Sequence, residues 1–256
     1  MLPPHKWEIS VSAGSNYSSL ADSFCGNDIS LCYENDYLGI QFFAHSYHID
    51  EIDDPIHVAQ RLYSLELLLN GALRAASWKR INTIPIQFTG FALCEVGCRY
   101  SIYAEDIEEN PFSQNPELDK DHSVYDNPRK NYSSYLFNLA KIDPNLRGIL
   151  FLLGLISTNS TIEKILTWGT LYKIFDSVKY HSKKIGIPID KLVDVSKLES
   201  FKAACNNMSI LGLYARHGVT ANPPPTKVII DISEAINLIS TMAANFCKRY
   251  VQIKYL

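Results

Sequence analysis

The sequence predicts an α+β protein in which a β-rich N-terminal part with one long helix precedes an all-α helical bundle. Residues 1–103 contain short runs of alternating apolar and polar side chains, which are typical of half-buried strands. Residues 133–256 place apolar side chains at helical spacing almost throughout. Residues 104–132, between them, are rich in acidic side chains and contain three prolines. We therefore expect two domains, 1–103 and 133–256, joined by an exposed acidic linker or loop.

The N-terminal part begins with a strand in which Trp7, Ile9 and Val11 fall on one face. A turn-like segment, 34–36, separates the next two strands. Pro85 places the fourth strand at a sheet edge or at a strand start. The expected strands are 6–11, 29–33, 37–44, 84–93 and 98–103.

A long amphipathic helix is expected over residues 55–79. Asp53 and Asp54 precede Pro55, and acidic residues and proline are both favoured at a helix N-terminus. The apolar residues that follow at helical spacing are Ile56, Ala59, Leu62, Leu65, Leu69, Ala72 and Leu73.

The C-terminal half shows several helix starts. Asp143 followed by Pro144 begins a helix that is apolar on nearly all sides up to Ile156, which predicts a central position. Ser160 and Glu163 form a capping box that opens a long helix ending before Gly186. Its expected buried stripe comprises Ile162, Ile165, Leu166, Leu171, Tyr172, Phe175 and Val178.

Two more helices complete the expected bundle. Ser196 and Glu199 form a second capping box, which opens a helix to about Met208. Asp231 opens the last helix. The buried stripe of that helix is expected to comprise Ile232, Ala235, Ile236, Ile239, Met242, Ala243 and Phe246.

Charge is distributed unevenly along the chain. Residues 1–132 carry 9 Lys+Arg against 19 Asp+Glu, a balance of −10, whereas residues 133–256 carry 15 against 8, a balance of +7. This asymmetry indicates either a charged partner for the basic half or attraction between the two halves.

The six cysteines are scattered. Cys94 and Cys98 have a loose metal-ligand spacing, and Cys25 and Cys32 could complete a tetrahedral thiolate site. Neither pair has the tight spacing of zinc knuckles, so we expect no metal site and reduced cysteines that pack among apolar side chains in the strands.

Several classes of function lack their motifs. The N-terminal residues have no secretory signal pattern, and the longest apolar run, 149–156, is far shorter than the roughly 20 residues of a membrane span. We therefore expect a cytoplasmic protein without a membrane partner. Glycine-rich phosphate loops and metalloprotease motifs are absent from the sequence, so no cofactor is expected. His45 and His48 are interpreted as surface or packing histidines.

The segment 206–218 holds the strongest candidate for chemistry, the adjacent pair Arg216 and His217. A guanidinium can stabilise a phosphate and an imidazole can transfer a proton, which together suffice for metal-free RNA cleavage. The alternative is structural, because both side chains at a helix end can bind terminal carbonyls. Candidate binding residues around the pair are Asn206, Asn207, Tyr214 and Asn222.

The Arg-His-Gly sequence near the end of the bundle, preceded by asparagines and followed by a proline-rich turn, resembles the HEPN superfamily. That superfamily consists of small helical bundles, often dimeric, found in bacterial toxin and phage-defence systems. The resemblance covers residues 133–256 and implies a HEPN-like bundle. Active members are RNases whose Arg and His are separated by several residues, whereas Arg216 and His217 are adjacent here.

Three functions therefore remain open, and whether the chain is an enzyme is undecided. The first is an interaction or effector subunit of a defence or toxin-type system, with a HEPN-like bundle that forms a homodimer or docks a partner protein. The second is a metal-independent RNase that uses Arg216 and His217. The third is a small-ligand or peptide sensor that uses the β-rich domain. RNA is a possible partner of the basic half.

Overall fold

The computed structural model describes residues 4–12, 17–37, 39–76, 85–115, 131–218 and 226–256. The chain divides into two compact units. The sheet unit comprises Met1–Ala72 with Asn82–Arg147, and the helical unit comprises Leu73–Ile81 with Gly148–Leu256. One antiparallel sheet and a set of helices confirm the α+β class.

The division between the units falls within helix α5 (Pro144–Gly154). Helix α4 (Tyr132–Ile142) therefore belongs to the sheet unit, although the sequence grouped it with the bundle. The domain limits drawn from the sequence stay predictions.

The sheet unit contains a five-stranded antiparallel sheet in the order β2-β3-β1-β4-β5. Its strands are β1 (Trp7–Ser12), β2 (Ser30–Asp36), β3 (Gly39–His45), β4 (Gln87–Leu93) and β5 (Arg99–Tyr100). All five lie within or beside the predicted segments, and β5 is shorter than expected.

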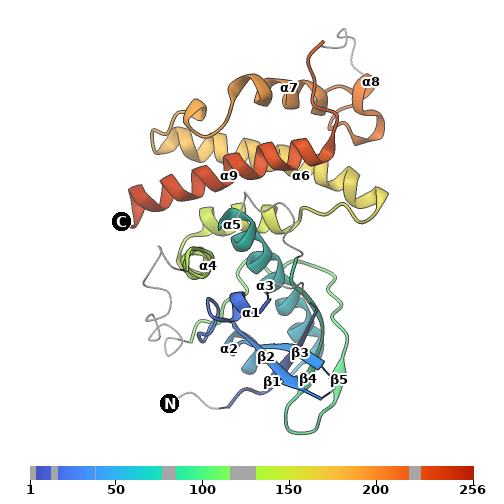
Figure 1. Ribbon diagram of the computed structural model, residues 1–256, viewed down its shortest axis with the longest axis vertical. Coiled ribbons are helices and arrows are strands. Elements are labelled where there is room, and N and C mark those ends of the chain that lie inside the picture. Colours follow the sequence, from blue (N-terminus) through green and yellow to red (C-terminus); the bar gives the residue numbers. More distant parts are fainter. Residues whose placement is uncertain (1–3, 13–16, 38, 77–84, 116–130, 219–225) are drawn as a thin grey trace. The chain divides into compact units, whose positions relative to one another are not determined.

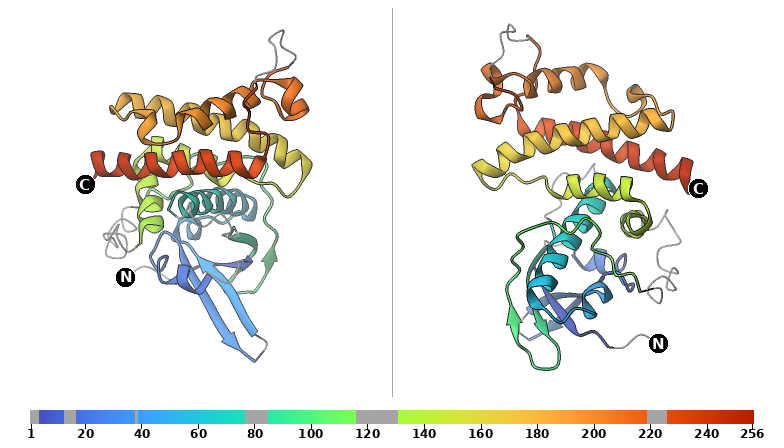
Figure 2. Two further views of the ribbon diagram at one scale, coloured as in Figure 1. Left: turned by 45° about the horizontal axis from the view of Figure 1, so that its top comes forward. Right: turned by 180° about the vertical axis from the view of Figure 1, so that it is seen from behind.

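The β2–β3 hairpin, which Figure 2 shows as a pair of long arrows, turns later than the sequence indicated. Glu34 pairs with Gln41, and Asp36 pairs with Gly39. The turn-like residues 34–36 therefore belong to β2, because backbone pairing with β3 overrides their low strand propensity.

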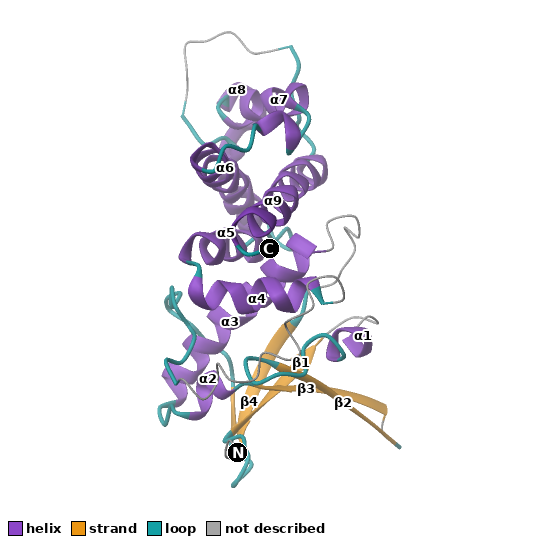
Figure 3. Ribbon diagram, turned by 90° about the vertical axis from the view of Figure 1, so that its left-hand side faces the viewer, coloured by secondary structure: helices purple, strands orange, loops and turns teal. Residues whose placement is uncertain are grey.

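Helix α3 (Pro55–Ala76) lies across one face of the sheet (Figure 3). Trp7 and Ile9 are buried on that face, whereas Glu8 is exposed on the other, so the predicted alternation in β1 is confirmed. The Asn70 side chain holds the backbone of Ile86, the residue directly before β4. It donates to the Ile86 carbonyl at 2.8 Å and accepts from the Ile86 N–H at 2.9 Å.

The segment that follows β5 is packed against the sheet unit over its first part. Pro111 and Phe112 are buried, and the Phe112 ring lies edge-on to Phe137 of α4 at 5.5 Å. The expectation of an exposed loop is therefore wrong for this part, because Phe112 supplies an apolar anchor. Residues 116–130 of the predicted linker lie outside the described residues.

Short helices α1 (Tyr17–Ala21) and α2 (Tyr47–Asp50) complete the sheet unit. The helical unit contains α6 (Thr161–Lys184), α7 (Val195–Cys205), α8 (Met208–Leu211) and α9 (Ile232–Lys254). Helices α6 and α9 lie side by side (Figure 1). Short 3-10 turns at Ile189–Lys191 and Gly212–Tyr214 complete this unit.

In the C-terminal half of the chain, the predicted helix starts are confirmed at three of four positions. Ser160 and Glu163 form the full capping box of α6, and Asp143 and Asp231 accept backbone N–H groups of α5 and α9. The fourth was wrong: α7 is capped by Asp194, whose carboxylate accepts from the N–H groups of residues 196 and 197. This charged acceptor starts the helix before Ser196.

The buried stripe of α6 is also rotated from the expected one at its N-terminal end. Ile162 and Leu166 are exposed, whereas Thr167 and Trp168 are buried. Trp168 stacks on Phe201 of α7 with ring centroids 6.0 Å apart, so the large aromatic ring decides which side of α6 faces the core.

Most apolar side chains of α5 are buried, as predicted. Arg74 caps the C-terminal end of α5. Its Nη1 donates to the carbonyls of Leu153 and Ile156 at 2.9 and 3.1 Å. Burial lowers the pKa of Arg74 to about 10.

The cysteines are all free, but they do not share one environment. Cys205 and Cys247 are buried, whereas Cys25, Cys94 and Cys98 are exposed, so the predicted packing in strands is wrong for these three. Within the described ranges, no group of three or more His, Cys, Asp or Glu side chains could hold a metal ion. No helix in the described part combines the length and apolar character needed to cross a bilayer.

Candidate functional site

Arg216 is held at two points in the helical unit. Its backbone N–H donates to the Cys205 carbonyl at 2.7 Å, which brings the chain back to the end of α7. Its guanidinium lies 4.1 Å from the centre of the Tyr172 ring and 3.9 Å from a carboxylate oxygen of Asp176. The side chain is 42% exposed, so a face-on contact fixes the guanidinium while solvent still reaches it.

His217 is exposed, and no hydrogen bond or ion pair among the described residues holds its side chain. A catalytic imidazole needs a partner that fixes its orientation. The nearby thiol of Cys205 is not an alternative nucleophile, because burial raises its pKa to about 12 despite the opposing charge of Arg216. Among the described residues, the geometry therefore places an exposed cation here beside an imidazole that has no hydrogen-bond partner.

The predicted binding residues near this pair have separate local environments. Asn207 caps α8 by accepting from the Ser209 N–H at 3.0 Å and the Ser209 hydroxyl at 2.7 Å. The Asn206 side-chain oxygen is buried without a hydrogen bond from the described residues. Tyr214 is half-buried at the end of the 3-10 turn, and Asn222 lies outside the described residues.

A second cationic surface lies where the C-terminal parts of α6 and α9 meet. The rings of His181 and Phe246 are 6.5 Å apart, and the Asn245 amide donates to the Leu192 carbonyl at 2.8 Å. These contacts gather three segments at one end of the helical unit. We call their exposed cations the basic end: Lys179, Lys183, Lys184, Lys191, Lys248 and Arg249.

An exposed aromatic side chain lies among these cations. Tyr180 is 57% exposed, and the Lys184 ammonium lies 4.6 Å from its ring centre. Asp190 is the one acidic residue within 179–191 and 245–254. No carboxylate of the described residues forms a salt bridge with a cation of the basic end.

The two units carry opposite charges. The helical unit has 16 Lys+Arg against 7 Asp+Glu, a balance of +9, and the sheet unit has 8 against 20, a balance of −12. The asymmetry seen in the sequence is therefore larger when the chain is divided as it folds.

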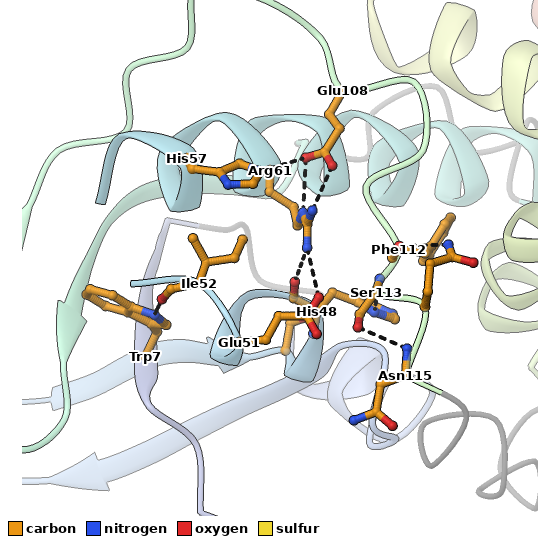
Figure 4. A network of polar contacts seen from close by, with 12 residues as sticks. Trp7, His48, Glu51, Ile52, His57, Arg61, Glu108, Phe112, Ser113 and Asn115 are labelled. Carbon is orange, nitrogen blue, oxygen red and sulfur yellow. Dashed lines mark hydrogen bonds and ion pairs between the residues drawn. The ribbon is translucent and has the colours of Figure 1, made fainter. Parts of the chain in front are cut away.

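A polar network in the sheet unit fixes the segment after β5 (Figure 4). The Arg61 guanidinium on α3 donates to both carboxylate oxygens of Glu108, at 3.0 and 2.8 Å, and to the His48 carbonyl at 2.9 Å. The His48 ring accepts from the Ser113 N–H at 3.0 Å. These bonds tie residues 108–113 to α2 and α3.

His48 is buried and its second ring nitrogen is 2.9 Å from Asp28. The Lys141 ammonium also lies 2.9 Å from that carboxylate. Burial alone would raise the pKa of Asp28, but the hydrogen bonds from His48 and Lys141 and the positive charge of Lys141 outweigh it and hold the pKa below its ordinary value. Because all three side chains are almost inaccessible, this network is a structural clamp.

Ser101, Tyr103 and Glu105, which precede the clamped residues 108–113 in the chain, form one wall of a pocket of about 390 Å³ in the sheet unit. The first two turns of α3, from Pro55 to Gln60, form a second side, and the sheet residues Phe91 and Tyr100 form a third. Gly90 allows this arrangement, because a side chain there would come within 2.8 Å of the Tyr100 carbonyl. Sequence reasoning missed this pocket, since its walls come from separate segments.

No protein-family model matches the chain, and no curated protein or solved structure matches it either. The described residues thus offer three candidate sites: the Arg216 surface, the basic end and the pocket beside α3. The six cations of the basic end form no salt bridge with a carboxylate of the described residues.

Proposed function

We propose that the chain is an interaction subunit whose helical unit binds RNA through the basic end. The observation that carries this proposal is six exposed cations at one end of the helical unit, where Lys184 lies over the exposed Tyr180 ring and Asp190 is the one acidic residue within 179–191 and 245–254. Phosphate groups bind such cations with release of counterions, and an exposed aromatic ring can stack on an unpaired base.

Single-stranded RNA fits this surface better than an acidic protein does. An acidic protein would use the cations, but it would have no specific use for Tyr180 beside them. Cations that follow a backbone and an aromatic ring that stacks on bases are together typical of single-strand binding. Arg216, held over Tyr172, offers a further exposed cation on the same unit.

We further propose that the subunit acts in a bacterial defence or toxin-type system and that its bundle is HEPN-like. This part rests on the resemblance of residues 133–256 alone. The lack of an oriented partner for His217 among the described residues favours docking over RNA cleavage, so the proposed role is non-catalytic.

The test is binding of a labelled single-stranded RNA at several salt concentrations. The expected affinity falls steeply with salt, and Lys183→Gln with Lys184→Gln reduces the slope of log K against log salt by about 0.7 for each phosphate that the variant no longer binds. Tyr180→Ala weakens binding at every salt concentration. The matched control is Lys197→Gln with Lys227→Gln, which removes two exposed cations of the helical unit outside the basic end.

Three results would overturn the proposal. Equal loss of affinity in the control would show that only net charge matters. Binding of polyglutamate but not of RNA would indicate an acidic protein partner. RNA cleavage in the presence of a chelator, lost in both Arg216→Ala and His217→Ala without a change in melting temperature, would show a metal-independent RNase.

A further inference from the structure

The pocket beside α3 has aromatic and acidic residues in its lining and, within the described part of the chain, no cation. Three aromatic residues, Phe91, Tyr100 and Tyr103, line it together with Glu105, and Phe91 is itself buried with 1% of its surface exposed. Among the described residues, no Lys, Arg or His lines it. Its volume of about 390 Å³ is in the range of small-molecule sites, which are typically about 300–1,000 Å³.

Two of these aromatic rings, Phe91 and Tyr100, are held in place by the sheet. Phe91 and Tyr100 face each other across β4 and β5, and their rings stack with centroids 5.3 Å apart. Trp7 supports both rings edge-on, at 5.4 and 5.9 Å. The third ring, Tyr103, is 71% exposed at the opening.

Further exposed carboxylates are next in sequence to residues that line the pocket. Asp53 and Asp54 directly precede the lining residue Pro55, and Asp106 follows Glu105; all of these acids are exposed. Arg61 of α3 pairs with Glu108, and Lys6, which precedes β1, pairs with Asp53; Arg99, next to the lining residue Tyr100 in sequence, is exposed. The Glu105 carboxylate has no hydrogen bond or ion pair within the described residues.

We infer that this pocket binds an organic cation, an ammonium group carrying alkyl substituents on an apolar body. Aromatic faces attract such a cation through their negative π surfaces, and they do so best when the cation is weakly hydrated. Glu105 supplies the counter-charge, and the balance of −12 in the sheet unit favours a cation over an anion. This binding site is separate from the proposed RNA surface and does not depend on it.

Choline and 3,3-dimethyl-1-butanol form a matched pair of probes, because they share a shape and differ in charge. The readout is the NMR resonance of the Trp7 indole N–H, since Trp7 contacts both stacked rings and donates to the Ile52 carbonyl at 3.1 Å. Choline at millimolar concentration is expected to shift this resonance, and the neutral alcohol is expected to bind about tenfold more weakly.

Variants of the full chain locate the binding. Glu105→Gln should weaken choline binding by up to about fivefold, as expected for one partly exposed ion pair. Tyr103→Leu should weaken it by about threefold or more, because the variant has no aromatic face for the cation at the opening. Glu95→Gln, which removes an exposed carboxylate of the same unit outside the pocket, should leave the affinity unchanged.

A peptide carrying one trimethyllysine distinguishes the two sources of such a cation. Tighter binding of the peptide than of choline supports a modified protein tail, whereas equal binding supports a small molecule. The inference is overturned if choline and the neutral alcohol bind equally. It is also overturned if neither choline nor the peptide shifts the Trp7 resonance, or if Glu105→Gln and Tyr103→Leu leave the affinity unchanged.

Discussion

Glu66 should make the sheet unit less stable as pH rises. Its side chain lies between α3 and β4, where it accepts a hydrogen bond from the Phe88 N–H at 2.6 Å. Burial raises the pKa of Glu66 from 4.5 to about 7, because the hydrogen bond offsets only part of the cost of burying the charge. Replacement by Gln keeps an acceptor oxygen for Phe88 and removes the charge.

The size of the effect follows from the shift in pKa. The folded state binds the proton more tightly than the unfolded state, so the stabilisation is fully present below pH 4.5 and is lost as pH rises to about 7. At about 1.4 kcal/mol per unit, the shift corresponds to about 3 kcal/mol of unfolding free energy. The stability of Glu66→Gln relative to the wild type should therefore rise by about this amount across the same range.

The assay is urea unfolding at pH values from below 4.5 to above 7, with Trp7 fluorescence as the readout. In all proteins compared, Trp78 and Trp168 are replaced by Phe, so that only Trp7 reports. Comparing the variant with the wild type cancels the titration of groups that both share. Glu95→Gln, which removes an exposed carboxylate, gives the background. Parallel stability curves for wild type and Glu66→Gln would refute the reasoning, because they would show that folding does not favour the protonated carboxyl.

Three other predictions concern the helical unit and its boundary. Ser160→Ala removes the capping box of α6 and should lower the unfolding free energy of the helical unit by about 1 kcal/mol, measured by Trp168 fluorescence; an unchanged value would contradict the cap. We predict that the helical unit forms a homodimer: the exposed Ile162 and Leu166 lie one turn apart on α6, so replacing both by Lys should abolish the dimer, and a wild type that is monomeric in light scattering would contradict the prediction. Limited trypsin digestion should cut first within residues 104–132, and first cuts within Thr161–Lys184 would show that the boundary is elsewhere.

The features that the sequence predicted well depend on residues that are close together in the chain. The alternation of Trp7 and Ile9 and the capping box of α6 are both complete within one element. Asp194 was overlooked because Ser196 and Glu199 also match the capping pattern, and only backbone geometry distinguishes the two starts.

The polar clamp and the pocket depend on residues that are distant in the chain. Arg61 and Glu108 are 47 positions apart, and in the sequence each alone resembles an ordinary exposed charge. Composition made the segment after β5 resemble a linker, since residues 104–132 contain eight acids and three prolines. The pairing of Glu108 with Arg61 and the burial of Phe112 anchor this segment just after Ser101, Tyr103 and Glu105, the residues that form a wall of the pocket.

The basic end shows how the fold can change the interpretation of a local pattern. Within the sequence, Lys179, Lys183 and Lys184 are explained by the negative end of the α6 dipole, which amounts to about half an elementary charge. The fold adds Lys248 and Arg249 of α9 to the same end of the unit, where Asp190 is the one nearby acid in 179–191 and 245–254. Half a charge at each helix end does not balance six cations, and their mutual repulsion costs stability unless an anion binds. That imbalance, rather than any single lysine, is the reason to look for a polyanionic partner at this end.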